Sequence, residues 1–101
     1  MPQAKINIPL KQIEDFCRRW KIKELALFGS VLRDDFRTDS DVDVLVTFEP
    51  DGGIMFDNRV EMSDELAAIL GHEVDLVEKD AIRNPFRRHN ILTTKEVVYA
   101  A

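Results

Sequence analysis

The chain has few of the features that mark secreted, membrane or nucleic-acid-binding proteins. It contains one cysteine, Cys17, which excludes an intrachain disulfide and fits a reducing compartment. No apolar run approaches the roughly 20 residues of a membrane span, and residues 1–10 lack the apolar core of a signal peptide. The formal net charge of -5 is not the basic excess of general nucleic-acid binding. We therefore expect a cytoplasmic protein without membrane contact or general affinity for nucleic acid.

Linkers, internal repeats and low-complexity tracts are also missing, so we expect a single domain over residues 1–101. Apolar residues recur at helical spacing after Pro9, in a stretch that runs from Leu10 to Trp20. A second helical stripe lies within residues 54–70, and Gly71 is a natural stop for it.

Three short apolar stretches predict strands at residues 24–28, 41–49 and 73–77. Residues 30–35 predict a short helix, and a basic helical stretch at 86–94 precedes an extended tail. Because strands alternate with helices, the sequence predicts an α/β or α+β fold with a small mixed sheet.

Two carboxylates, Asp41 and Asp43, stand one residue apart at the start of the second predicted strand. In a strand, residues i and i+2 point the same way, with Cα atoms about 6.5–7 Å apart. Carboxylates without histidine or cysteine favour Mg²⁺ or Mn²⁺ over zinc, and Mg²⁺ commonly bridges such groups to substrate phosphates. Asp75, near the start of the third predicted strand, is a candidate third ligand. For an isolated pair, a solvated strand entrance is the alternative.

Gly29 and Ser30 favour the phosphate interpretation. A glycine between a buried strand and a helix lets the backbone approach a ligand closely, and free N–H groups at a helix start bind phosphate. The Ser30 hydroxyl can add a donor, although an ordinary N-cap is its alternative role. Together the two motifs predict a phosphate site beside a metal site.

The pattern Gly29-Ser30, ten residues, then Asp41-Val42-Asp43 resembles that of the DNA polymerase β-like nucleotidyltransferase superfamily. The stretch from residue 27 to 46 is similar to the minimal nucleotidyltransferases, which include MNT-domain antitoxins, and residues 73–77 match their third acidic strand. The resemblance spans nearly the whole chain and implies the nucleotidyltransferase fold. Val31 and Asp34 depart from the arginine and glycine of many relatives.

The resemblance also implies a site and a reaction. Asp41, Asp43 and Asp75 would be catalytic and would hold two Mg²⁺ ions (or Mn²⁺), while Gly29, Ser30 and Arg33 would bind the phosphates of ATP. The implied reaction transfers AMP from ATP to a hydroxyl, and pyrophosphate leaves. We expect Asp75 to accept the hydroxyl proton.

The expected partner is a helical HEPN-domain toxin encoded beside this chain, with a tyrosine hydroxyl as acceptor. Only 26 residues follow Asp75, which we interpret as too few for a separate acceptor-binding domain. The chain would then be the antitoxin of a toxin–antitoxin module, and homo- or hetero-oligomers are compatible with this role. The alternatives are an antitoxin that acts by binding alone, and an enzyme that modifies a small molecule.

Other conspicuous residues have simpler interpretations. Cys17 and Trp20 are expected to pack in the core. Arg83, Arg87 and Arg88 either contact triphosphate or an acidic partner, or form a solvated helix face, and the sequence does not decide between these roles.

Overall fold

A four-stranded mixed sheet organises the computed structural model, which describes residues 6–37, 39–50 and 58–101. The strand order is β3-β2-β1-β4, in which β1 is antiparallel to both neighbours and β2 is parallel to β3. The strands are β1 (Ile22–Phe28), β2 (Val42–Phe48), β3 (Val74–Glu78) and β4 (Glu96–Ala100). The helices are α1 (Leu10–Arg19), α2 (Arg59–Leu70) and α3 (Pro85–Thr94), with the short 3₁₀ helices η1 (Gly29–Leu32) and η3 (Lys79–Ala81).

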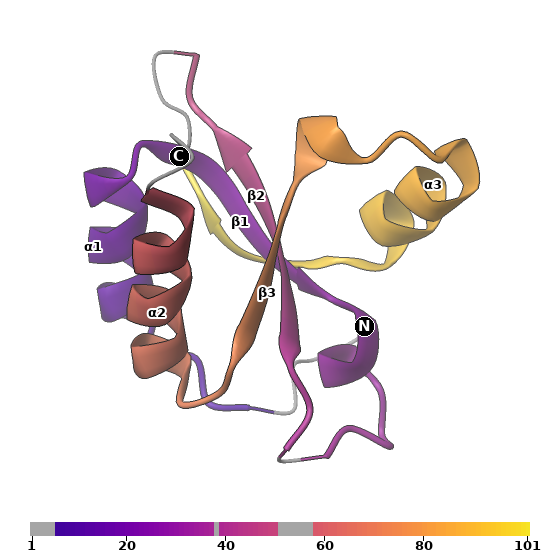
Figure 1. The fold of residues 1–101 in the computed structure, drawn as a ribbon, viewed down its shortest axis with the longest axis horizontal. Coiled ribbons are helices and arrows are strands. Elements are labelled where there is room, and N and C mark those ends of the chain that lie inside the picture. Colours follow the sequence, from indigo (N-terminus) through magenta and orange to yellow (C-terminus); the bar gives the residue numbers. More distant parts are fainter. Residues whose placement is uncertain (1–5, 38, 51–57) are drawn as a thin grey trace.

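Apolar residues cover both faces of the sheet. Figure 1 shows α1 and α2 together on one face and α3 on the other. Val42, Val44 and Val46 of β2 are fully buried in the cluster that contains the apolar residues of α1 and α2. Leu45, which points the opposite way, is buried in a second cluster with Ile91 of α3. Because α3 buries few residues, its remaining surface is free to line a site.

The parallel pairing of β2 with β3 brings distant carboxylates together. A parallel connection needs a crossover, and here α2 provides it. In the observed register Asp43 lies opposite Asp75, while on the other side of β2 it lies opposite Phe28 at the end of β1. The starts of β2 and β3 and the end of β1 therefore meet at one edge of the sheet.

The predicted elements agree with the observed ones, with small differences. The predicted α/β or α+β fold with a mixed sheet is confirmed, and the extended tail is the fourth strand. Leu10, the first apolar residue of the predicted first helix, is 63% exposed. The start of the second predicted helix, residues 54–57, lies outside the described residues. Within the described ranges, no helix has the length and apolarity needed to cross a bilayer.

Cys17 lies in the core on α1, as the sequence predicts. Its side chain has no exposed surface, and burial raises the pKa of its thiol to about 12. The reactive form of cysteine is the thiolate, which is therefore scarce in the folded protein.

We expect Cys17 to resist a water-soluble aromatic disulfide reagent in the native protein and to react rapidly in urea. The reaction is followed by absorbance, with free glutathione as the control. Native reactivity as fast as that of glutathione would contradict the core position.

Two glycines of the described part of the chain adopt the left-handed conformation, which residues with a side chain adopt only rarely. Gly71 (φ +72°) ends α2, where its N–H donates to the Ala67 carbonyl at 2.8 Å, and a Cβ there would meet nothing within 4 Å. Gly29 (φ +76°) directly follows β1, and a Cβ there would overlap Oδ2 of Asp43. The two positions thus share the backbone constraint, but only Gly29 has the steric one.

These glycines provide a matched pair of alanine substitutions. Gly71→Ala should cost about 1–2 kcal/mol of unfolding free energy, the cost of a left-handed backbone. Gly29→Ala should cost clearly more, because its methyl group must also displace the Asp43 carboxylate. Urea unfolding of both variants measures the difference. Adding Asp43→Ala to Gly29→Ala should recover the excess, and equal costs for the two single variants would contradict this contact.

Candidate nucleotide and metal site

The turn after β1 carries Gly29 and Ser30, but its helix is shorter than the sequence predicts. The helix expected at residues 30–35 is the four-residue 3₁₀ helix η1, which begins at Gly29 and ends at Leu32. Ser30 lies inside η1 rather than at its N-cap, which is Phe28, so the alternative role of Ser30 as an N-cap was wrong. Because one turn has little macrodipole, phosphate binding here would depend on individual backbone N–H groups and the Ser30 hydroxyl.

The three predicted acidic residues gather at the same edge of the sheet. Asp41 is exposed and directly precedes β2, Asp43 is half-buried in β2, and Asp75 is exposed in β3. Asp43 is the central member, because it follows Asp41 by two residues and pairs in register with Asp75. Asp43 also packs directly against the Gly29 backbone.

The pKa of the Asp43 carboxyl depends on the charged side chains that lie near it. Burial, followed by the negative charges of Asp75 and Asp41, raises the pKa of the Asp43 carboxyl above its usual value. The positive charges of Arg87 and Arg33 act in the opposite direction. Two acidic and two basic side chains therefore surround one half-buried carboxylate.

The donor set suits a hard divalent cation. Asp41, Asp43 and Asp75 offer carboxylate oxygens, and Mg²⁺ and Mn²⁺ prefer such ligands. In the described part of the chain, no three acidic, histidine or cysteine side chains are already arranged around one point as metal ligands. A bound cation would therefore require these side chains to move closer together. Asp41 and Asp75 can move in this way because both are exposed.

Arg33 lies at the end of η1, on the side of the site away from β3. Its side chain is exposed, and its Nε lies 3.3 Å from Oδ1 of Asp35. Arg37 and Asp39 form a similar exposed pair at 3.5 Å. Exposed pairs of this kind contribute little to stability, so the contact with Asp35 leaves Arg33 able to bind a substrate.

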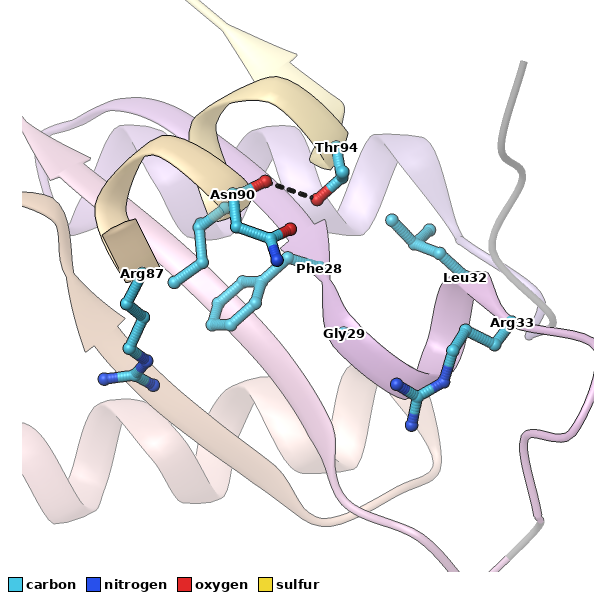
Figure 2. Close-up of a pocket in the computed structure, with 8 residues that line it drawn as sticks. Phe28, Gly29, Leu32, Arg33, Arg87, Asn90 and Thr94 are labelled. Atoms are coloured by element: carbon cyan, nitrogen blue, oxygen red, sulfur yellow. Dashed lines mark hydrogen bonds between the residues drawn. The ribbon is translucent and has the colours of Figure 1, made fainter. Parts of the chain in front are cut away.

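A pocket of about 450 Å³ opens beside Gly29, between η1 and α3 (Figure 2). One wall comes from β1 and η1 and the other from α3; the lining residues are Phe28, Gly29, Leu32, Arg33, Arg87, Asn90, Ile91 and Thr94. Of these, sequence reasoning named Gly29 and Arg33 as binding residues and left the role of Arg87 open between triphosphate, an acidic partner and solvent. The others were missed because the two walls are more than 50 residues apart, and only packing of α3 on the sheet joins them.

The three arginines near α3, whose roles the sequence left open, differ in the structure. Arg87 lines the pocket. Arg88 donates from Nη1 to the Lys79 carbonyl at 2.9 Å and so ties α3 to η3. Arg83 is exposed before the helix begins. The basic stretch is therefore neither a uniform solvated face nor a uniform binding surface.

Comparison with known proteins identifies the family. A family model described as a nucleotidyltransferase domain matches residues 10–98. The protein adenylyltransferase MntA of Thermococcus cleftensis is 36% identical over 81 residues, which cover 80% of this chain and 77% of that protein.

Solved structures share the fold. A crystal structure described as a toxin–antitoxin with AMP-PNP matches with a TM-score of 0.72 at 22% identity, over 93% of this chain and 75% of that one. A tri-AMPylated Shewanella oneidensis HEPN toxin in complex with MNT antitoxin matches with a TM-score of 0.64 at 22% identity, over 91% of this chain and 70% of that one.

These matches confirm the predicted fold, and the family model also confirms the resemblance drawn from Gly29-Ser30 and Asp41-Val42-Asp43. The chain belongs to the nucleotidyltransferase domain family.

Proposed function

We propose that this chain transfers AMP from ATP to a hydroxyl of a HEPN toxin and thereby acts as its antitoxin. A similar protein and a structural neighbour support this role. The similar protein from Thermococcus cleftensis is a protein adenylyltransferase, and one structural neighbour holds an AMPylated HEPN toxin with its MNT antitoxin. Another neighbour was crystallised with the ATP analogue AMP-PNP, which supports a nucleotide triphosphate as donor.

One observation in the structure carries the proposal. Asp43 lies between Gly29, which it contacts, and Asp75, which is its partner in the parallel register. Backbone suited to phosphate thus adjoins carboxylates suited to a cation, as transfer of a nucleotidyl group requires.

Asp41, Asp43 and Asp75 would hold two Mg²⁺ ions, or Mn²⁺ in their place. When bound, such ions would neutralise the charge of the triphosphate and stabilise the negative charge on the attacking and leaving oxygens of the displacement. The donor set fits this role, because burial, and after it the charges of Asp75 and Asp41, raise the pKa of the Asp43 carboxyl, and a bound cation would offset both effects.

The remaining groups position the reactants. The Gly29 backbone and the Ser30 hydroxyl would bind the phosphates, and Arg33 would add positive charge beside them. The acceptor oxygen forms a bond to the α-phosphorus of ATP, the bond from that phosphorus to the bridging oxygen breaks, and pyrophosphate leaves. Asp75, which is exposed to an incoming acceptor, would take the hydroxyl proton.

The acceptor we propose is a tyrosine hydroxyl of a helical toxin that is encoded beside this chain and meets it in the cytoplasm. The open edge that carries Asp41 and Asp75 leaves room for a macromolecular acceptor. Neutralisation by binding alone is the competing function, and modification of a small molecule is a third.

Changing Asp41 and Asp43 together to Asn separates catalysis from binding. The variant nearly preserves shape, but amide oxygens are poor ligands for Mg²⁺, so AMP transfer should be lost. Intact-mass measurement should show AMP-sized additions to the HEPN partner with wild-type protein and Mg²⁺–ATP, and none with the variant. Size-exclusion chromatography should show that both bind the partner.

Survival of cells that produce the toxin distinguishes catalysis from binding alone. If catalysis neutralises the toxin, cells that carry the double variant should lose protection. Full protection by the variant, with no mass added by the wild type, would establish the binding-only function instead.

Asp43→Asn alone should raise stability when no divalent cation is present. A raised pKa means that the folded state binds the proton more tightly than the unfolded chain does, so ionised Asp43 disfavours folding. The gain should be full at pH values above the raised pKa and should vanish below the ordinary value of 3.8. Urea unfolding at several pH values, with Glu49→Gln as a control near the opposite end of β2, measures it. A variant less stable than wild type at neutral pH would contradict this account.

A further inference from the structure

The pocket between η1 and α3 has the size and composition of a nucleotide site. Its volume of about 450 Å³ falls within the range of small-ligand sites. Phe28, Leu32 and Ile91 supply apolar walls, and polar groups of Asn90 and Thr94 lie on the α3 side. In Figure 2 the guanidinium groups of Arg87 and Arg33 lie on opposite sides of Gly29. An apolar interior with cationic groups at its rim suits a base and ribose inside and phosphates at the edge.

The backbone at Arg87 is held in place by the structure around it. Asn84 caps α3 by accepting from the N–H groups of Phe86 at 2.9 Å and Arg87 at 3.2 Å. Arg88 ties the same turn to η3, and Ile91 anchors the helix in the core. The backbone that carries Arg87 is therefore fixed before a ligand arrives, which lowers the entropic cost of binding.

The Arg87 guanidinium is available to a ligand. Within residues 6–37, 39–50 and 58–101, it takes part in no hydrogen bond or ion pair. It nevertheless lies near the acidic site, because its charge opposes the rise in the pKa of Asp43. A guanidinium between a nucleotide-sized pocket and the carboxylates is well placed to bind the phosphates of a nucleotide that extends from the pocket toward the carboxylates.

We propose that Arg87 binds the β- and γ-phosphates of ATP from the α3 side, opposite Arg33, with the base and ribose in the pocket lined by Phe28 and Asn90. This inference rests on the proposed function, because it takes ATP as the donor. Guanidinium groups bind phosphate oxygens through paired charge-assisted hydrogen bonds, so two arginines can enclose the end of the triphosphate. They would also stabilise the pyrophosphate that leaves.

The Asn90 side chain completes the pocket. Its backbone carbonyl accepts from Thr94 Oγ1 at 2.7 Å, and within the described part of the chain its side-chain amide makes no hydrogen bond. An amide has a donor and an acceptor, which match the N6 and N7 edge of adenine. The pocket thus offers a specific contact for the base as well as volume.

Calorimetric titration of the isolated chain with Mg²⁺–ATP and with AMP tests the proposal. Arg87→Gln should weaken ATP binding about ten- to hundredfold, as expected for losing charge-assisted hydrogen bonds. Binding of AMP, which lacks the β- and γ-phosphates, should change by less than about threefold. Arg83→Gln is the matched control, because it removes the same charge from an exposed position that does not line the pocket. Thermal unfolding checks that both variants fold.

Two outcomes would overturn the inference. Arg87→Gln could bind ATP as well as Arg83→Gln does, or it could lose ATP and AMP binding equally. If the variant kept its ATP affinity but lost the HEPN partner on size-exclusion chromatography, the guanidinium would serve the protein interface instead. If the wild-type chain bound no ATP, the proposed function and this inference would both fail. If the wild type bound ATP and only the Arg87→Gln result differed from expectation, this inference alone would fail.

Discussion

The contact between the Asp43 carboxylate and the backbone of Gly29 is the constraint on which the site depends. It requires a residue without a side chain at the end of β1, in a conformation that glycine adopts readily. It also requires β2 to pair with β1 in one register, because a shift by one residue would turn Asp43 toward the other face. The turn that we propose to bind phosphate and the acidic residues are thus parts of one packing arrangement.

This arrangement costs stability at the position where the chemistry is proposed. Asp43 is half-buried beside two other carboxylates. Burial and the charges of these neighbours disfavour its ionised form and so raise its pKa. The core compensates from both faces of the sheet, since β2 contributes fully buried valines to one cluster and Leu45 to the other. A divalent cation held by these carboxylates would relieve their mutual repulsion.

The location of α3 gives the site its second wall. The helix is anchored by Ile91, by the Asn84 cap and by the hydrogen bond from Arg88 to Lys79. Most of its surface remains outside the core, so its polar residues can face a ligand without the cost of burying them. The result is a pocket beside Gly29 whose two walls come from segments more than 50 residues apart in the chain.

The sequence by itself determined the elements whose pattern is local. Alternation in β2, helical spacing in α1 and α2 and the stop at Gly71 follow from short-range geometry, and the spacing of Gly29-Ser30 from Asp41-Val42-Asp43 identified the family. Local reasoning was wrong for the length of the helix after β1, and it did not show that Leu10 is exposed. Helical spacing does not show where the buried face begins, and the chain after Leu32 leaves the 3₁₀ turn. Only the tertiary structure placed Asp75 opposite Asp43 and separated Arg87 from Arg88, because strand register and the seating of α3 depend on burial of apolar residues far apart in the chain.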